Sequence, residues 1–369
     1  MNISNNRERV SLIINSLDNG GAENVCLNLA NSFAGKNLDV KLIVLKESDR
    51  SMSQYLDSRV ELINLDVSRA RYSAIALYKC FKNFDLGTLL VFNHQLLMIS
   101  LVSRIIMSGR FKIYSRGINT LSKELESNKS FFNGRFLKLL IKSLYPKVDG
   151  VICQSQGMKE DLLKLIPKLD GKLITINNPI NERYRNISIE KIGDENYVLF
   201  IGRLEKQKNL YDAIDIFSQV NNKFPELKFY IVGAGSEQEN LKNYVHEKNL
   251  TSHVIFHGSI NDPKRIASFY SNAKATVLTS LFEGFPNVLV ESISFGTPVV
   301  AFDCMSGPKD IIVDQVNGYL IELNNANEFQ EKLMRTIEID WDRASVQRTV
   351  AHLDSKAVSC GYLDYMGIL

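Results

Sequence analysis

One stretch near residue 280 constrains the fold more than any other part of the sequence. Ala275–Leu278 is apolar and rich in β-forming residues, and a polar loop follows it. A helix is predicted from Asn287, because Pro286 suits the first turn of a helix. A Gly-Thr-Pro turn should end that helix before the apolar strand 299–302. Strand, loop, helix and strand in this order predict an α/β fold.

The same stretch predicts the chemistry of a ligand. The free amides at the start of a helix attract an anion such as phosphate. Glu283 in the loop and Glu291 on the helix suit hydroxyl groups instead, and Asn287 shares a helix face with Glu291. A ligand that carries both phosphate and hydroxyl groups, such as a sugar nucleotide, fits this combination.

The spacing from Glu283 to Glu291, with its flanking strand and Gly-Thr-Pro turn, resembles the E-x7-E segment of retaining glycosyltransferases of family 4. These enzymes have the GT-B architecture. The resemblance implies that Glu283 and the loop amides hold the donor sugar, while Glu291 holds the nucleotide ribose. The loop residues concerned are Gly284, Phe285, Pro286, Asn287 and Val288. Two glutamates at this spacing would otherwise indicate only solvated surface charges.

A second motif, G-R-L-x-x-Q-K-N at 202–209, follows the apolar strand Tyr197–Ile201. It resembles a hallmark of the same enzymes, in which Arg203 and Lys208 clamp the donor diphosphate. A guanidinium and an ammonium together can neutralise a leaving diphosphate without a metal. The strand 229–232 ends in further glycines. By the same resemblance Gly202, Gly233 and Gly235 line the nucleotide site.

No metal or other cofactor is expected. The sequence lacks the Cys and His spacings of zinc sites. Asp340-Trp341-Asp342 is formally a D-x-D motif, but it does not follow a strand, so we interpret it as incidental.

The first half carries weaker signals. Gly20 and Gly21 lie between an apolar strand and an amphipathic helix, which indicates either a phosphate or sugar loop or a plain tight turn. His94 follows a strand, where open α/β sheets bind ligands, and is either catalytic or structural. Arg116 also follows a strand, and either reaches a phosphate or pairs on the surface.

Charge is unevenly distributed along the chain. Residues 1–190 carry 27 Lys and Arg against 18 Asp and Glu, a net +9, whereas residues 191–369 carry 17 against 23, a net −6. The segment 122–147 has an apolar stripe with lysines beside it, which indicates either an anionic membrane face or an ordinary domain helix. No signal peptide or membrane span is evident, so we expect either a cytoplasmic protein or a cytoplasmic protein that is peripheral on the inner face of the cytoplasmic membrane. No nucleic-acid motif is present.

These signals predict two doubly wound Rossmann-like domains that face a cleft. The expected divisions are an acceptor-binding domain at 1–185, a nucleotide-sugar-binding domain at 195–345, and a helical tail at 346–369 that crosses back to the first domain. The resemblance implies transfer of a hexose or N-acetylhexosamine with retention, from a UDP-sugar to a saccharide or lipid-linked oligosaccharide of O-antigen or capsule type. A sugar-nucleotide 2-epimerase of GT-B architecture is the alternative, and a catalytically dead sugar-nucleotide scaffold is disfavoured because the motif residues are intact.

Overall fold

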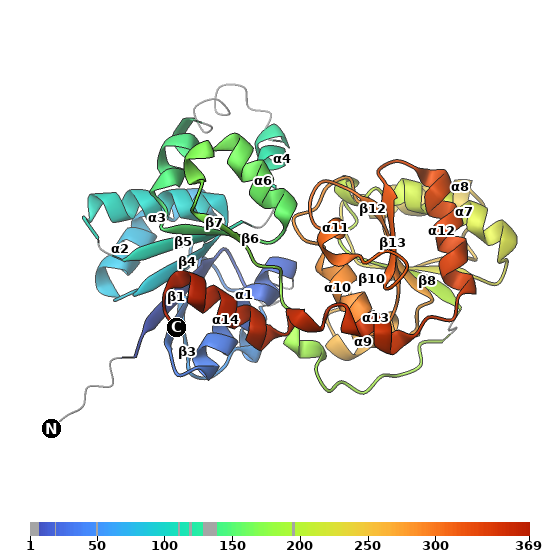
Figure 1. Cartoon of the computed structure of the whole chain (residues 1–369), viewed down its shortest axis with the longest axis horizontal. Helices are drawn as coiled ribbons and strands as arrows, with labels where there is room; N and C mark the ends of the chain where they lie inside the picture. The colour runs from blue at the N-terminus through green and yellow to red at the C-terminus, as the bar shows by residue number, and fades with distance from the viewer. Residues whose placement is uncertain are drawn as a thin grey trace. The chain divides into compact units, whose positions relative to one another are not determined.

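The chain divides into two compact units. A computed structural model describes residues 7–18, 20–48, 51–109, 111–117, 120–127, 139–193 and 196–369. Unit 1 comprises Met1–Pro179 together with Ser355–Leu369, and unit 2 comprises Ile180–Asp354. Each unit contains a parallel sheet with helices packed on it, which confirms the predicted α/β class (Figure 1).

Unit 1 is built on a seven-stranded sheet of order β3-β2-β1-β4-β5-β6-β7, in which every pair is parallel. The strands are β1 (Arg9–Ile14), β2 (Asp39–Val44), β3 (Val60–Asn64), β4 (Thr88–Phe92), β5 (Lys112–Arg116), β6 (Gly150–Cys153) and β7 (Leu173–Thr175). The helices are α1 (Gly21–Gly35), α2 (Ala74–Asn83), α3 (His94–Ile106), α4 (Leu121–Ser127), α6 (Gln156–Leu165) and α14 (Ser355–Met366). The strand order reverses between β1 and β4, where open α/β sheets bind ligands.

The first strand shows why this sheet is buried on both faces. Its residues alternate between two apolar clusters, with Leu12 in one and Ile13 in the other. A strand covered by helices on both faces needs this continuous apolar sequence. The face that includes Leu12 is completed by Tyr362 and Leu363 of α14, which confirms that the C-terminal helix returns to the first domain.

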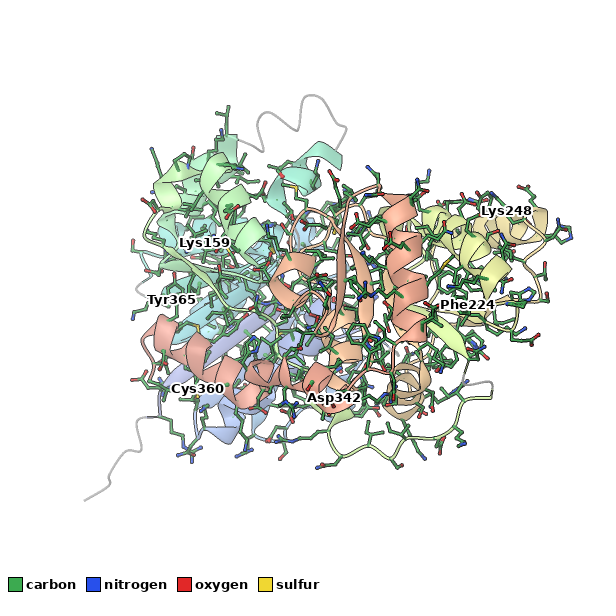
Figure 2. All side chains as sticks on the ribbon, turned by 45° about the vertical axis from the view of Figure 1, so that its right-hand side comes forward. Lys159, Phe224, Lys248, Asp342, Cys360 and Tyr365 are labelled. Atoms are coloured by element: carbon green, nitrogen blue, oxygen red, sulfur yellow. The ribbon has the colours of Figure 1, made fainter. Side chains whose placement is uncertain are left out.

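Polar contacts also hold α14 against unit 1. The Tyr365 hydroxyl donates to the carbonyl of Lys172 at 2.6 Å. Lys36 Nζ lies 3.0 Å from Cys360 Sγ, and both Cys360 and Tyr365 are marked on α14 in Figure 2. The helix is therefore an integral part of this unit.

Unit 2 is built on a six-stranded parallel sheet of order β10-β9-β8-β11-β12-β13. The strands are β8 (Tyr197–Ile201), β9 (Lys228–Val232), β10 (Val254–Gly258), β11 (Ala275–Leu278), β12 (Val299–Asp303) and β13 (Gly318–Glu322). The helices are α7 (Leu210–Lys223), α8 (Gln238–Glu247), α9 (Pro263–Asn272), α10 (Asn287–Ser294), α11 (Pro308–Ile311), α12 (Ala326–Glu338) and α13 (Arg343–Arg348). The order reverses between β8 and β11, so the loops after these two strands meet at a switch point.

The two units divide at slightly different residues from the expected boundaries of 185 and 345. Ile180 donates its amide to the carbonyl of Leu353 within unit 2, at 2.9 Å. Val346 and Val350 are buried in the same cluster as Leu353. These contacts group residues 180–185 and 346–354 with unit 2.

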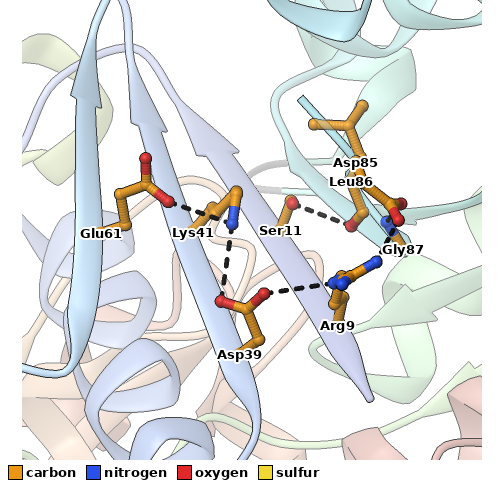
Figure 3. A network of polar contacts seen from close by, with 8 residues as sticks. All are labelled: Arg9, Ser11, Asp39, Lys41, Glu61, Asp85, Leu86 and Gly87. Carbon is orange, nitrogen blue, oxygen red and sulfur yellow. Dashed lines mark hydrogen bonds and ion pairs between the residues drawn. The ribbon is translucent and has the colours of Figure 1, made fainter. Parts of the chain in front are cut away.

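Charged side chains connect the amino ends of the first three strands (Figure 3). Asp39 lies 3.3 Å from Arg9 and 3.5 Å from Lys41, and Lys41 lies 3.0 Å from Glu61. Arg9 also pairs with Asp85. Exposed ion pairs each contribute little to stability, and this network lies at the edge opposite the carboxyl-end loops.

The basic stretch 122–147 lies only partly within the described residues. Lys129, Arg135 and Lys138 lie outside them. In the described part Ile141 and Leu144 are buried in the core, while Lys142 is exposed. This part therefore packs as a domain helix. Among the described residues no helix is long and apolar enough to cross a membrane.

The five cysteines are free thiols. Four of them are buried. Burial raises the pKa of Cys80 to about 11 and that of Cys153 and Cys304 to about 12. These three thiols therefore stay protonated and act as small apolar groups.

Candidate active site

The switch point of unit 2 brings two predicted catalytic residues together. Lys208 lies in the loop after β8, and Glu283 lies in the loop after β11. Lys208 Nζ donates to Glu283 Oε1 at 2.6 Å, and the two side chains are only 14% and 9% exposed. The sequence predicted both residues separately, and the structure joins them in a largely buried ion pair.

A glutamine that the sequence analysis did not single out holds these two loops in register. Gln207 Nε2 donates to the carbonyl of Phe282 at 2.6 Å, and the amide of Leu281 donates to the carbonyl of Gln207 at 2.9 Å. Thr279 Oγ1 donates to the carbonyl of Lys208 at 3.0 Å. Gln207 is a positioning residue, and its place in the G-R-L-x-x-Q-K-N motif was the available signal.

The loop from Gly284 to Pro286 rests on a glycine that follows β12. Gly307 has φ +101°, and a Cβ there would lie 2.5 Å from Pro286 Cδ and 3.2 Å from the carbonyl oxygen of Gly284. Phe285 is 6% exposed and packs into an apolar cluster. Phe285 therefore anchors the loop through its side chain.

The helix α10 begins at Asn287, as predicted, with Pro286 just before it. Asn287 and Val288 are partly exposed, whereas Leu289 and Ile293 are buried. The first turn of the helix thus presents its amides beside the Glu283 loop. An anion would be stabilised there by the helix dipole.

The charged group of Arg203 is exposed, whereas that of Lys208 is largely buried in an ion pair. The Arg203 guanidinium forms no hydrogen bond or ion pair with any residue that the structure describes. Gly202 precedes it at the end of β8 and is partly exposed. A guanidinium without a hydrogen-bond partner among the described residues can engage an anionic ligand without first breaking such a contact.

Gly233 and Gly235 allow the loop after β9 to lie against the loop after β8. A Cβ at Gly233 would lie 1.8 Å from the carbonyl oxygen of Gly202, and one at Gly235 would lie 2.3 Å from that of Leu204. Gly233 also has φ +142°. Both glycines are thus required by packing, and their predicted contact with the nucleotide stays a prediction.

Glu291 has an unusual environment. Its Oε2 accepts a hydrogen bond from the Tyr270 hydroxyl at 2.9 Å. Burial raises the pKa of the Glu291 carboxyl to about 7, although the hydroxyl of Tyr270 and the charge of Arg183 partly oppose that rise. Near neutral pH this carboxyl therefore exchanges readily between its charged and neutral forms. Its predicted contact with ribose stays a prediction.

In unit 1 the glycine loop meets a carboxylate of its own helix. Gly20 precedes α1 and Gly21 is its first residue. A Cβ at Gly20 would lie 2.3 Å from Glu23 Oε2. Glu23 in the first turn already complements the positive end of this helix dipole. A phosphate at this place would meet that negative charge.

His94 begins α3 directly after β4 and is 8% exposed. Its Nδ1 lies 3.1 Å from the Tyr145 hydroxyl, which in turn lies 3.1 Å from Ser115 Oγ. Asn93 caps the helix by accepting from the amide of Gln95 at 2.7 Å. The imidazole is thus oriented at the carboxyl edge of the sheet, and its catalytic role stays a prediction.

Arg116 is fully buried, so its interpretation as a surface ion pair is wrong. Its Nη2 donates to Asn178 Oδ1 at 2.6 Å, its Nε donates to the Tyr362 hydroxyl at 3.2 Å, and its Cζ lies 4.8 Å from the Phe92 ring centroid. The sequence of β5 gave no sign that α14 would cover the end of that strand. The guanidinium ties α14 to the sheet, and contact with a phosphate stays a prediction.

The D-x-D segment has a structural use. Asp342 caps α13 by accepting from the amide of Ala344 at 3.1 Å, and it also accepts from Ser345 Oγ. No group of three or more His, Cys, Asp or Glu with a metal-binding arrangement occurs in the described ranges. Metal independence stays a prediction.

Two family descriptions together match most of the chain. "Glycosyltransferase Family 4" matches residues 19–184, and "Glycosyl transferases group 1" matches residues 183–350. The boundary between the two matches lies close to the division between the units.

Characterised relatives match over different shares of their length. The N-acetylgalactosamine-N,N'-diacetylbacillosaminyl-diphospho-undecaprenol 4-alpha-N-acetylgalactosaminyltransferase of Campylobacter jejuni is 27% identical over 90% of this chain and 91% of its own. The lipopolysaccharide 1,6-galactosyltransferase of Escherichia coli is 31% identical over 46% of each chain.

Solved structures match the whole fold. The lipopolysaccharide outer core galactosyltransferase WaaB superposes with a TM-score of 0.74 at 20% identity, and the match covers 97% of this chain and 99% of that one. HepE from Anabaena, solved with UDP and glucose, gives a TM-score of 0.76 at 17% identity over 98% of this chain and 100% of its own. These matches give no support to the epimerase alternative. The chain belongs to glycosyltransferase family 4 and is a glycosyltransferase of GT-B architecture.

Proposed function

We propose that the enzyme transfers a hexose or N-acetylhexosamine, with retention of anomeric configuration, from a UDP-sugar to a saccharide or lipid-linked saccharide acceptor. The glycan would be an O-antigen, a capsule or a similar surface polymer. The donor binds unit 2, and the acceptor binds unit 1.

The ion pair of Lys208 with Glu283 carries the donor assignment. It places a cation and a carboxylate 2.6 Å apart, at the switch point of a sheet where nucleotides bind. The carboxylate can accept hydrogen bonds from sugar hydroxyls, while the ammonium faces the phosphates. A donor with both groups on adjacent atoms satisfies the two side chains together.

Departure of the nucleotide diphosphate is the step that needs positive charge. Arg203 and Lys208 stabilise the charge that develops on the leaving oxygen, and the amides at the start of α10 add to it. Glu291 accepts from the ribose hydroxyls. The acceptor hydroxyl attacks from the face that the leaving group vacates.

Charge on the protein makes a divalent metal unnecessary in this proposal. Two cations and the helix amides replace the metal that a D-x-D site would recruit. Activity should persist in EDTA. Full loss of activity in EDTA, with recovery on addition of Mn²⁺, would overturn this part.

The names of the relatives support the proposed acceptor and donor. The Campylobacter relative acts on a diphospho-undecaprenol-linked sugar, and another is a poly(ribitol-phosphate) alpha-N-acetylglucosaminyltransferase from Staphylococcus aureus. HepE was solved with UDP-glucose, and the pneumococcal transferase GtfA was solved with UDP and GlcNAc.

A donor screen tests the proposal. UDP-glucose, UDP-galactose and their N-acetylamino forms are each supplied with and without a lipid-linked saccharide acceptor, and UDP release is measured. We expect release that depends strictly on the acceptor. Conversion of the donor sugar to its 2-epimer without an acceptor would instead establish the epimerase.

A further inference from the structure

A polar hollow lies in unit 1. Its volume is about 510 Å³, and it opens at the carboxyl ends of β1, β2 and β3. Three cations line it, Lys46, Arg69 and Arg71, together with one carboxylate, Asp18. We propose that this hollow binds the phosphate-bearing part of the acceptor, an inference that rests on the proposed transferase function.

The three cations are available to a ligand. All three are exposed, and none forms an ion pair with a carboxylate of the described residues. The guanidinium carbon of Arg71 lies 4.9 Å from the centroid of the Tyr72 ring, which restricts the side chain without neutralising it. Arginine presents two parallel N–H groups to a phosphate, so two arginines with a lysine favour a phosphate or diphosphate over a single carboxylate.

The carboxylate that lines the hollow is held in place by two hydroxyl groups. Asp18 accepts hydrogen bonds from Ser16 Oγ, at 3.0 Å, and from Ser48 Oγ. Such a carboxylate repels phosphate but accepts hydrogen bonds from hydroxyl groups. A ligand that satisfies the cations and this carboxylate together carries both phosphate and hydroxyl groups, as a sugar phosphate or a polyol phosphate does.

Two residues that line the hollow are close in sequence to the predicted site residues Gly20 and His94. Gln95 lines the hollow, and the preceding residue is His94. Asp18 belongs to the same loop between β1 and α1 that contains Gly20. A phosphate held in the hollow would keep the attached sugar or polyol near these residues. The hollow therefore suits an acceptor rather than a second donor.

Binding of inorganic pyrophosphate, measured by calorimetry with saturating UDP present, tests the inference. The UDP fills the donor site, so the remaining binding reports on the hollow. We expect Arg69→Gln with Arg71→Gln to weaken pyrophosphate binding at least tenfold, with UDP affinity and melting temperature unchanged. The matched control, Lys79→Gln with Lys82→Gln on α2, removes the same charge outside the hollow and should have little effect.

Competition then identifies the source of the phosphate. Displacement of pyrophosphate by farnesyl diphosphate supports a lipid-linked diphosphate acceptor, and displacement by a glycerol phosphate oligomer supports a polyol phosphate acceptor. Absence of pyrophosphate binding, or equal weakening in the control variant, overturns the inference. Loss of UDP binding in the parent protein would instead contradict the proposed function.

Discussion

Lys208 and Glu283, which lie 75 residues apart in the sequence, share a hydrogen-bonded ion pair of 2.6 Å. The two predicted roles, diphosphate contact and sugar contact, are thus coupled before any ligand binds. Removing one partner leaves the other charge largely buried without this ion pair, which is costly.

A double-mutant cycle should detect this coupling. For Lys208→Met and Glu283→Gln we expect a coupling of about 1–3 kcal/mol in the free energy of unfolding. The control cycle uses Lys223 and Glu338, an ion pair of unit 2 whose side chains are 52% and 50% exposed. That pair should give no more than about 0.5 kcal/mol. Similar values for both cycles would contradict a structural role for the buried pair.

Arg203 should behave differently from Lys208. Because its guanidinium has no hydrogen-bond partner among the described residues, Arg203→Ala should leave the melting temperature unchanged. It should lower kcat/KM, and the decrease should correspond to a loss of roughly 2–4 kcal/mol of transition-state stabilisation. The control is Lys206→Ala, which removes another exposed cation from the same loop. Equal activity losses in the two variants would point to a general charge effect rather than a contact with the leaving group.

The Glu291 carboxyl should make UDP binding depend on pH. Because burial raises its pKa to about 7, ionisation costs the folded protein free energy, and the stability that the neutral form contributes is lost as pH rises through about 7. Ribose hydroxyls need the carboxylate, so UDP affinity should rise roughly tenfold from pH 6 to pH 8. Glu291→Gln should lose this dependence and retain that of UDP itself. Identical pH profiles for the two proteins would refute the assignment.

Much of the fold follows from local sequence patterns, but contacts between residues that are distant in the sequence do not. The loops after β8 and β11 and the start of α10 were predicted because glycine, proline and apolar runs act locally. The edge strand β3 was not predicted, because Glu61 interrupts its short apolar pattern. The pairing of Lys208 with Glu283 and the burial of Arg116 depend on which distant segments become neighbours. Strand order and the path of α14 decide those contacts, and no local pattern encodes them.

Gly233 should tolerate a methyl group less well than Gly258. Both have positive φ, but a Cβ at Gly233 would lie 1.8 Å from a backbone oxygen, whereas nothing lies within 4 Å of one at Gly258. Gly258→Ala should cost about 1 kcal/mol from backbone strain alone. Gly233→Ala should cost about 3 kcal/mol or more, because the loops must separate. Urea unfolding measures both, and equal costs would show that the loops yield easily.

Membrane docking gives a prediction for the basic side of unit 1. Each Lys or Arg near an anionic bilayer contributes about 1 kcal/mol within a Debye length. If Lys142 and Lys147, both exposed, face the bilayer, Lys142→Glu with Lys147→Glu should abolish sedimentation with anionic vesicles. Activity on a soluble acceptor should be kept. Vesicle binding that is absent in the parent, or unaffected by the reversal, would exclude this docking surface.

The return of α14 to unit 1 has a consequence for synthesis on the ribosome. Tyr362 and Leu363 complete the apolar cluster around Leu12, yet Ile180–Asp354 must be translated before they exist. Until then the nascent chain exposes the part of its first sheet that α14 covers, while the residues of unit 2 emerge together and can fold as a unit. Unit 1 is therefore the first to be made and the last to be finished.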